Sequence, residues 1–453
     1  MSTFKINPTI KTGYLLLGCD KNRVDAEKLM AFLQEHGFRP INSLEEAEVI
    51  IVNTCSFIQD ARQEAVDTIL EAGKYKTEGS CKLLVVTGCM AQMYREEVLQ
   101  EIPEVDLVVG LNSYSKLPQL LRRSMKDKIR ISVSDPPGKT SFPGAGRINT
   151  TPPYSVYLKI SEGCNNRCNY CVIPYLRGPY REYSMSDLFY EARDLVKKGA
   201  REINLVAQDT SYYGYPGKGE SNLPDLLNLL SRIKKLDWIR VLYTHPAHIN
   251  ERLIRTISKN PKVCSYIDVP LQHVSTGVLQ GMGRPYDKKQ IEELIRHIKK
   301  AQLTIRTTFM LGFPGEKEED FNELLSFIKK YPLDRVGAFL YSPEKGTPAA
   351  ELKKRVPVGV QKRRYRKLMK TQKKISNLLN FQEVGKTHPV LIEETLHREN
   401  GKAVYHYRGR TPLQAPEVDG CVYFTSAKQY ECGEIVYVMV TSCNSYDLFG
   451  NSM

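Results

Sequence analysis

The sequence has no apolar run long enough to cross a membrane. Its longest apolar runs, such as Val49–Val52 and Leu83–Val86, have the length of a strand. The first residues, MSTFKINPTIKTG, also lack the apolar segment of a secretory signal. These two absences predict a chain that works in the cytoplasm and has no membrane partner.

The chain also lacks an even number of cysteines that could all pair in disulfides. The chain has 11 cysteines, and an odd number does not fit a complete disulfide framework. In a reducing compartment these cysteines are expected to be metal ligands and spare thiols. Acidic residues are in deficit, because 65 Lys and Arg outnumber 51 Asp and Glu and give a net charge of +14. That charge favours an anionic partner, either nucleic acid or a ribonucleoprotein, although a merely basic soluble protein is the alternative.

A length of 453 residues suits roughly three domains of about 150 residues each. In the first domain, apolar runs alternate with helical patterns, which predicts an open parallel α/β sheet. In the second, six such runs predict a partial (β/α)6 barrel, TIM-like, with its active site at the C-terminal strand ends. Residues 134–153 are rich in Pro, Gly, Ser and Thr and mark a boundary. The predicted segments are a first domain at 12–125, a linker at 126–153, a core at 154–380 and a tail at 383–453.

The strand predictions rest on short apolar runs that lie between helical patterns or turn residues. In the first domain they are Tyr14–Leu17, Val49–Val52, Leu83–Val86 and Val105–Val109. In the second they are Val156–Ile160, Glu202–Ala207, Ile239–Tyr243, Tyr266–Val269, Ile305–Leu311 and Val336–Tyr341. In the tail they are Val390–Glu393, Val404–Tyr407, Gly420–Phe424 and Ile435–Val440.

A loop directly after the first strand of the core holds three cysteines. Cys164, Cys168 and Cys171 are spaced C-x3-C-x2-C, and three thiolates in so short a loop suit an iron–sulfur cluster. A four-iron cluster held by three cysteines keeps one iron open to chelate a small molecule, which makes the loop a candidate catalytic site. Zinc or unrelated thiols are the alternatives, but no fourth Cys or His follows within about 70 residues, as a zinc site would need.

Three cysteines in the first domain each follow a predicted strand. They are Cys19, Cys55 and Cys89. Because ligands bind at the carboxyl ends of strands in an open α/β sheet, these thiols are expected to converge on one edge and to hold a second cluster. Cys81 precedes its strand and is expected at the opposite edge. Three buried thiols without a metal are the alternative.

The central loop resembles the signature of the radical S-adenosylmethionine enzymes. The resemblance implies that the open iron binds S-adenosylmethionine, which one electron cleaves to a 5′-deoxyadenosyl radical, and that Tyr170 lies near the adenine. Other candidate cofactor contacts follow later strands: Gln208 and Asp209 after the second, Gly312 and Gly315 after the fifth. Arg177 and Arg181 are expected either to meet a carboxylate of cofactor or substrate or to lie on the surface.

Both cysteine sets together resemble the methylthiotransferases, which carry two 4Fe-4S clusters and use S-adenosylmethionine. Gly18–Asn22 followed by Val24–Glu27 is similar to their motif G-C-P-K-N-x-V-D-S-E, with Asp20 and Ala26 as departures. The segments Gln208–Thr210 and Asp268–His273 are similar to the family that modifies an aspartate of ribosomal small-subunit protein 12. The implied reaction is β-methylthiolation of that residue. The alternatives are methylthiolation of a tRNA adenosine and a non-catalytic, metal-stapled RNA-binding protein.

The tail resembles the TRAM domain, a small β-barrel. Its nine acidic residues outnumber its six basic ones, which favours a basic protein substrate. The expected contacts are the exposed acids among Glu393, Glu394, Glu417 and Asp419, and the sequence does not show which of these are exposed. The connector before it, Glu351–Asn380, has 11 basic residues against one acid, and its basic face is expected to touch ribosomal RNA or to be a solvated face. The implied partners are protein 12, free or in the small subunit, and a reducing electron donor.

Overall fold

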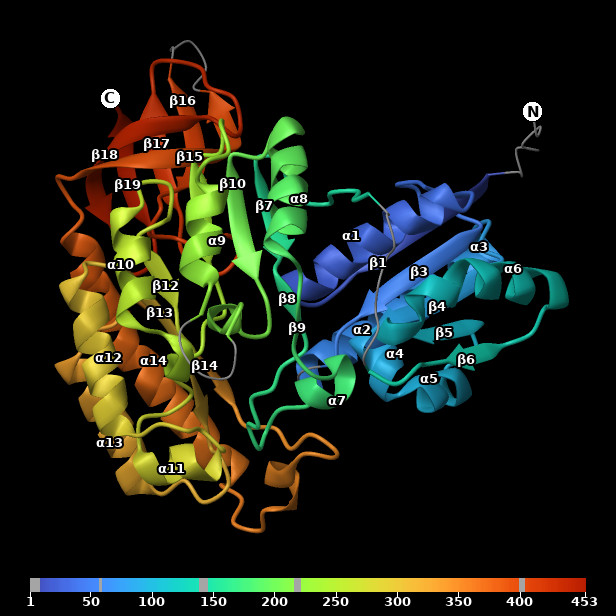
Figure 1. Ribbon diagram of the computed structural model, residues 1–453, viewed down its shortest axis with the longest axis horizontal. Coiled ribbons are helices and arrows are strands. Elements are labelled where there is room, and N and C mark those ends of the chain that lie inside the picture. The colour runs from blue at the N-terminus through green and yellow to red at the C-terminus, as the bar shows by residue number, and fades with distance from the viewer. Residues whose placement is uncertain (1–8, 57–58, 138–145, 216–220, 399–403) are drawn as a thin grey trace. The chain divides into compact units, whose positions relative to one another are not determined.

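The computed structural model describes residues 9–56, 59–137, 146–215, 221–398 and 404–453. The chain forms two compact units, which Figure 1 traces by colour. The first unit contains the chain up to residue 151 together with residues 162–165 and 172–181. The second contains residues 152–161, 166–171 and 182–453. Two pieces of the cysteine loop therefore fold with the first unit, although the loop follows the first strand of the second.

The first unit is built on a six-stranded parallel sheet with the strand order β2-β1-β3-β4-β5-β6. The four predicted strands are present, and two edge strands of three residues each were too short to show a pattern. The strands are β1 (Ile10–Leu16), β2 (Phe38–Pro40), β3 (Val49–Thr54), β4 (Leu83–Gly88), β5 (Leu107–Gly110) and β6 (Ile131–Val133). The helices are α1 (Asp20–Glu35), α2 (Gln59–Gly73), α3 (Tyr75–Glu78), α4 (Cys89–Met93), α5 (Arg95–Glu101), η1 (Leu111–Lys116), α6 (Leu117–Asp127) and α7 (Ile173–Arg177).

Helices cover both faces of this sheet. Helices α1, α6 and α7 pack on one face, where Leu176 joins the core, and α2 and α5 pack on the other. Every residue of β3 and β4 is buried, which explains why these strands are continuous apolar runs rather than alternating ones. Short α7 belongs to the cysteine loop, so this loop supplies part of the first unit's core.

The predicted linker at 126–153 is not a free connection along its whole length. Its residues 131–133 form β6, which pairs with β5. Asp135 accepts a hydrogen bond from the Ser113 hydroxyl at 2.8 Å and pairs with Lys116 at 2.6 Å. Further on, Arg147 pairs with buried Glu27 of α1. The rest of the prediction, residues 138–145, lies outside the described residues.

The second unit contains the predicted partial barrel of six parallel strands, arranged as β7-β10-β11 and β12-β13-β14. An isolated parallel bridge between Ile239 and Val263 connects the two halves. The strands are β7 (Ser155–Lys159), β10 (Glu202–Val206), β11 (Trp238–Val241), β12 (Tyr266–Asp268), β13 (Thr304–Leu311) and β14 (Arg335–Leu340), and the two-residue strands β8 (Ser161–Glu162) and β9 (Arg181–Glu182) flank the cysteine loop. The helices are α8 (Met185–Lys197), η2 (Thr210–Tyr212), α9 (Leu223–Leu230), η3 (Pro246–His248), α10 (Glu251–Lys259), α11 (Thr276–Gly281), α12 (Lys288–Lys300), α13 (Glu318–Lys330) and η4 (Pro348–Glu351).

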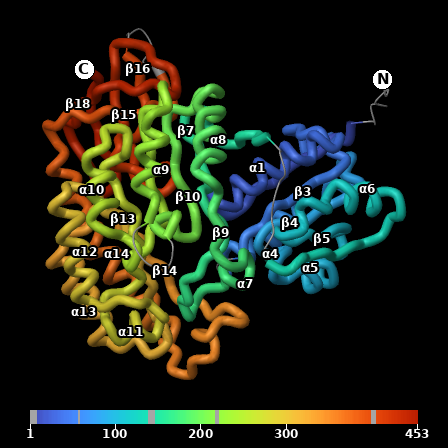
Figure 2. The backbone as a smooth tube through the Cα atoms, viewed as in Figure 1, coloured from blue at the N-terminus to red at the C-terminus, as the bar shows by residue number. Residues whose placement is uncertain are grey.

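The C-terminal part forms a closed barrel of five strands in the order β15-β16-β17-β19-β18. Figure 2 follows the chain into it from β14 through the long helix α14 (Val358–Phe381). The strands are β15 (Thr387–Arg398), β16 (Tyr405–Arg410), β17 (Val422–Ser426), β18 (Ile435–Cys443) and β19 (Leu448–Ser452). Among the described residues, no helix has both the length and the apolarity needed to span a bilayer.

The C-terminal barrel lies at the end of the central sheet where β10 begins (Figure 1), and buried charges hold it there. The fully buried carboxylate of Glu202 pairs with Arg410 at 2.6 Å and with Arg240 at 3.0 Å. Its pKa falls to about 2 because these two guanidinium groups outweigh the burial that would raise it. This network closes the bottom of the partial barrel and leaves the C-terminal strand ends for the candidate site.

Two of the four acids expected to contact the substrate are used in this packing. Glu393 pairs with Arg410 at 2.7 Å, and Asp419 pairs with Arg306 at 3.3 Å and accepts a hydrogen bond from Tyr266 at 2.7 Å. Glu393 and Asp419 are therefore not among the exposed acids from which the contacts were expected, because both carboxylates stabilise the fold of the second unit. Glu417 is exposed, and Glu394 is partly exposed and pairs with Arg408 at 3.1 Å.

Candidate active site

The structure brings together the three strand-end cysteines of the first unit. Strands β1, β3 and β4 are neighbours in the sheet, and Cys19, Cys55 and Cys89 follow their carboxyl ends. A Cβ added to Gly18 would lie 3.0 Å from the Cβ of Cys55, so the loops of Cys19 and Cys55 touch. The thiols of Cys19 and Cys55 also act electrostatically on Cys89. Cys81 precedes β4 and lies apart from this set.

Side-chain amides and hydroxyls hold these strand ends in place. The Asn22 amide of α1 donates to the carbonyl of Leu17 at 2.9 Å and to that of Thr54 at 3.1 Å. The amide of Asn53 donates back to the carbonyl of Asn22 at 3.3 Å, and the Thr54 hydroxyl donates to the carbonyl of Thr87. Each cysteine therefore follows a strand end that is hydrogen-bonded to a neighbouring segment.

The donor set fits an iron–sulfur cluster. The pKa of the Cys89 thiol is raised to about 12, chiefly by burial; Arg177 opposes the rise, and Cys19 and Cys55 add to it. Such a thiol keeps its proton in the protein alone, whereas a coordinated metal ion would remove it. Three convergent soft donors are the ligand chemistry that iron–sulfur clusters use.

Arg177, whose role the sequence left open, is buried and is not at the surface. Its guanidinium pairs with Asp25 of α1 at 2.8 Å and with Glu162 at 2.9 Å, inside the first unit. Arg181 is partly exposed and donates to the carbonyls of Arg177 and Pro179 at 3.1 and 3.2 Å. Among the described groups, then, both arginines are held by the protein itself.

The central cysteine loop is tied to each unit by backbone hydrogen bonds. In the first unit, the amide of Cys164 donates to the carbonyl of Gly178 at 3.1 Å. In the second, the amide of Cys171 donates to the carbonyl of Cys168 at 3.1 Å, and Asn169 donates to the carbonyl of Met282 at 2.9 Å. These bonds fix the backbone of each piece of the loop within its own unit.

A buried arginine also lies beside the second-unit cysteines. The guanidinium of Arg284 is 5.9 Å from the centroid of the Tyr170 ring and interacts electrostatically with the thiols of Cys168 and Cys171. Burial raises the pKa of the Tyr170 hydroxyl, and Arg284 opposes that rise. The residue as a whole is partly buried, and the adenine contact that the resemblance implies stays a prediction.

Asp209, a predicted cofactor contact, is the centre of a buried hydrogen-bond network. Its carboxylate accepts from Asn166 of the cysteine loop at 2.8 Å and from the Ser211 hydroxyl at 2.7 Å, and it meets Nδ1 of His248 at 2.7 Å. Burial would raise the pKa of Asp209, but the hydrogen bonds with His248 and Ser211 and the electrostatic effect of His245 lower it. Asp209 therefore anchors the loop to the end of β10, and a direct cofactor contact by Asp209 or by partly exposed Gln208 stays a prediction.

Two histidines beside Asp209 were not found in the sequence. One ligand atom from each of Asp209, His245 and His248 lies within 4.8 Å of the other two. Burial lowers the pKa of His245 to about 3, and its Nε2 has no hydrogen-bond partner in the part of the chain that the structure describes. The pattern His-Pro-Ala-His directly after the third barrel strand is the signal that could have revealed them.

The two glycines after β13 have different surroundings. Gly312 has a φ of +80°, and an added Cβ would lie 2.3 Å from the Cγ of Gln361 in α14. Gly315 has a φ of +90° and nothing within 4 Å of an added Cβ. The close approach at Gly312 is therefore to the protein itself, whereas Gly315 leaves open space for a ligand.

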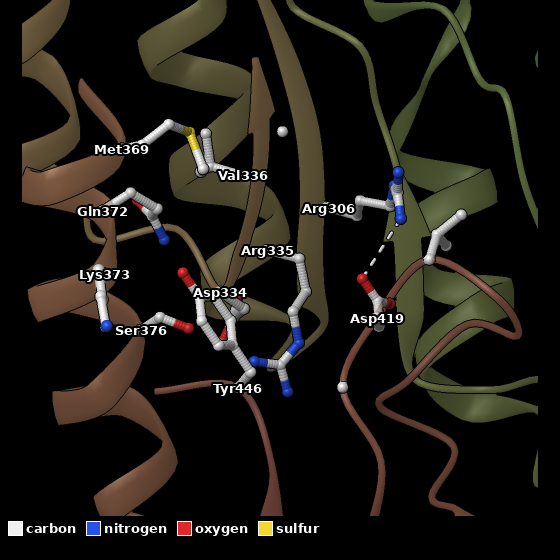
Figure 3. Close-up of a pocket in the computed structure, with 13 residues that line it drawn as sticks. Arg306, Asp334, Arg335, Val336, Met369, Gln372, Lys373, Ser376, Asp419 and Tyr446 are labelled. Carbon is white, nitrogen blue, oxygen red and sulfur yellow. Dashed lines mark hydrogen bonds and ion pairs between the residues drawn. The ribbon is translucent and has the colours of Figure 1, made fainter. Parts of the chain in front are cut away.

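Figure 3 shows a cavity of about 130 Å³ at the opposite end of the central barrel. Arg306 of β13 and Arg335 of β14 line it together with Asp419 and Tyr446 of the C-terminal barrel. The guanidinium of Arg306 already pairs with Asp419 across it. The cavity thus belongs to the contact that closes the barrel bottom, and its lining contains none of the predicted cluster or cofactor residues.

Comparisons with known families divide the chain in three. Residues 11–110 match the uncharacterized protein family UPF0004, residues 158–328 match the radical SAM superfamily, and residues 384–453 match the TRAM domain. The match to the radical SAM superfamily includes the C-x3-C-x2-C loop, and the first match includes Cys19, Cys55 and Cys89.

Solved structures support the fold at low sequence identity. A radical S-adenosylmethionine methyltransferase, TsrM from Kitasatospora setae, has a TM-score of 0.56 at 15% identity, over 76% of this chain and 75% of that one. The cobalamin-dependent S-adenosylmethionine radical enzyme OxsB has a TM-score of 0.53 at 12% identity, over 82% of this chain and 56% of that one. These similarities concern the architecture and not the reaction.

Curated relatives match almost from end to end. The ribosomal protein uS12 methylthiotransferase RimO of Desulforudis audaxviator is 44% identical over 434 residues, which are 95% of this chain and 94% of that protein. The protein of the same name from Clostridium botulinum is 43% identical over 97% of both chains. The one from Geobacter sulfurreducens is 41% identical over 98% of this chain and 99% of the relative. The chain therefore belongs to the radical SAM methylthiotransferases, in the family of the ribosomal protein uS12 methylthiotransferases.

Proposed function

We propose that this chain transfers a methylthio group to the β-carbon of an aspartate residue in ribosomal protein uS12, the small-subunit protein 12. The observation that carries the proposal is the convergence of Cys19, Cys55 and Cys89 in a chain that also has the C-x3-C-x2-C loop. The substrate follows from the names of the near full-length relatives. The proposed cofactors are two 4Fe-4S clusters and two molecules of S-adenosylmethionine, with a reducing electron donor.

The division of labour follows the two cysteine sets. When bound, the clusters and S-adenosylmethionine supply the methylthio group and the radical chemistry that removes hydrogen from the substrate β-carbon. Cys19, Cys55 and Cys89 hold the cluster for sulfur chemistry, and Cys164, Cys168 and Cys171 hold the cluster for cofactor cleavage. The hydrogen bond from Asn166 to Asp209 fixes the second loop at the strand end, and Tyr170, Gln208, Asp209, Gly312 and Gly315 are the proposed cofactor contacts.

The reaction test uses full-length, anaerobically reconstituted enzyme with S-adenosylmethionine and a reductant. The substrates are free uS12, intact small ribosomal subunits and bulk tRNA, each analysed by mass spectrometry. We expect one methylthio group in place of one hydrogen on a uS12 aspartate and no change in tRNA. Modification of a tRNA adenosine with uS12 untouched would replace this proposal by the tRNA enzyme, and a colourless protein that cleaves no cofactor would leave only an RNA-binding role.

We also propose that helix α14 contacts ribosomal RNA when uS12 is in the small subunit. The helix has no acidic residue, and seven of its cations are exposed: Lys362, Arg363, Arg366, Lys367, Lys370, Lys373 and Lys374. Arg364, the eighth, is buried and pairs with Glu316 at 2.8 Å and with Glu318 at 3.1 Å. A face of exposed cations without acids is suited to neutralise phosphates.

Reversing three of these charges should affect binding to small subunits and binding to free uS12 differently. We expect Lys362→Glu, Lys370→Glu and Lys374→Glu, combined, to weaken binding to intact small subunits at least tenfold and to leave binding to free uS12 unchanged, as measured by titration at several salt concentrations. The salt dependence should also become weaker, because fewer counterions are released. The matched control reverses exposed lysines on other helices, Lys197, Lys289 and Lys329. Equal loss in both triple variants would mean that only net charge matters.

A further inference from the structure

A buried arginine of the cysteine loop contacts helix α1 and one of the three strand-end cysteines of the first unit. The Arg177 side chain at the end of α7 is 3% exposed. Its Nη1 donates to Oδ2 of Asp25 at 2.8 Å and to both carboxylate oxygens of Glu162 at 2.9 and 3.1 Å. Its Nη2 donates to Sγ of Cys89 at 3.8 Å. One guanidinium therefore joins two carboxylates and a thiol that are far apart in the sequence.

The geometry needs an arginine. A guanidinium is a rigid planar fork with five N–H donors, so one nitrogen can hold the carboxylates while the other points at sulfur. An ammonium group is a single point donor on a flexible stem and cannot reach both sides with fixed directions. The two carboxylates also keep the cation in place, because a buried charge needs paired partners. Nη2 of Arg177, which faces Cys89, is therefore held in position before a cluster binds.

We propose that Arg177 is a positioning residue that sets the reduction potential of the iron–sulfur cluster held by Cys19, Cys55 and Cys89. It does so through an N–H···S hydrogen bond to Cys89 and through its charge. Hydrogen bonds to cluster sulfur and the local charge are two of the means by which a protein tunes such a potential. A reduced cluster carries more negative charge, so a fixed cation beside it raises the potential, and the carboxylates of Asp25 and Glu162 lower it. This inference rests on the proposed function, because it requires a cluster at these three cysteines.

The experiment isolates that cluster in the full-length chain. The background carries Cys164→Ala, Cys168→Ala and Cys171→Ala, so that any remaining iron signal comes from the first unit. The potential is measured by a redox titration followed by electron paramagnetic resonance. We expect Arg177→Met to shift the midpoint downwards by at least a tenfold change in the one-electron equilibrium, about 59 mV. Arg177→Lys, which keeps the charge and loses the fork, should give a smaller downward shift.

Removing a carboxylate should shift the potential in the opposite direction. Glu162→Gln keeps the size and an acceptor for Arg177 but removes one negative charge, so the midpoint should rise. Asp25→Asn should act in the same way. This reversal of sign is the result that a merely structural role for the ion pairs would not produce, and it remains measurable if Arg177→Met does not fold.

The matched control is another buried ion pair of the same unit. Arg147 pairs with Glu27, and both side chains are at most 5% exposed. Arg147→Met should lower the thermal stability of the unit, measured by circular dichroism on heating. Its midpoint potential should equal that of the background protein, which carries only the three cysteine substitutions. An unchanged midpoint in both Arg177→Met and Glu162→Gln would overturn the inference while the cluster assignment stands. A background protein without iron would instead overturn the two-cluster proposal, and this inference with it.

Discussion

Replacing Cys164, Cys168 and Cys171 by alanine is expected to lower the iron content from about eight to about four per chain and to abolish cleavage of S-adenosylmethionine. The three thiolates are the only ligands that the loop offers, and a cluster that has lost them cannot present an open iron. Iron analysis gives the first number. Formation of 5′-deoxyadenosine under reducing conditions gives the second.

The control removes the same number of thiols from elsewhere in the chain. Cys81 and Cys264 are buried, Cys432 is exposed, and none of the three belongs to either cysteine set. A variant with alanine at these three positions should keep its iron and its cleavage activity. If the first variant cleaved S-adenosylmethionine at a rate near that of the unmodified chain, the assignment of the central loop as the cluster site would be wrong.

Replacing Cys19, Cys55 and Cys89 by alanine should have the complementary effect. The other half of the iron should be lost and methylthio transfer to uS12 should disappear, while S-adenosylmethionine is still cleaved in the absence of transfer. The reason is that the two sets of thiols follow different strands and, in the proposed function, hold different clusters. Mass spectrometry of uS12, run beside the 5′-deoxyadenosine assay, separates the two activities in one sample. If this variant still transferred the group, the three cysteines would be ordinary buried thiols.

The architecture was largely predictable because it depends on patterns that are local in the sequence. The six barrel strands and the four inner strands of the first sheet are apolar runs, and their ends fall within a few residues of the predicted ones. The position of Cys19, Cys55 and Cys89 at one edge then follows from parallel strand order alone. Edge strands β2 and β6 were missed because three residues do not establish a period.

The surroundings of the site could not be predicted, because they depend on contacts between distant residues. Asp25 and Arg177 are 152 positions apart, and no local pattern relates them. Gly312 was predicted as a cofactor contact, and no local pattern shows that a Cβ added there would meet the side chain of Gln361 from a later helix. Likewise, the charge count of the tail did not reveal that Glu393 and Asp419 are paired with arginines inside the second unit.

The division of the cysteine loop between the two units has a consequence for how the protein is made. A ribosome synthesises the chain from its N-terminus, so segments that come later in the sequence also emerge later. A nascent chain that ends at residue 151 contains the whole six-stranded sheet and Cys19, Cys55 and Cys89, but it lacks Glu162, Leu176 and Arg177. If the proposed cluster binds at these three cysteines, its surroundings are complete only after the radical SAM loop has been synthesised. We therefore expect maturation of that site to depend on synthesis of the loop and not on synthesis of the sheet alone.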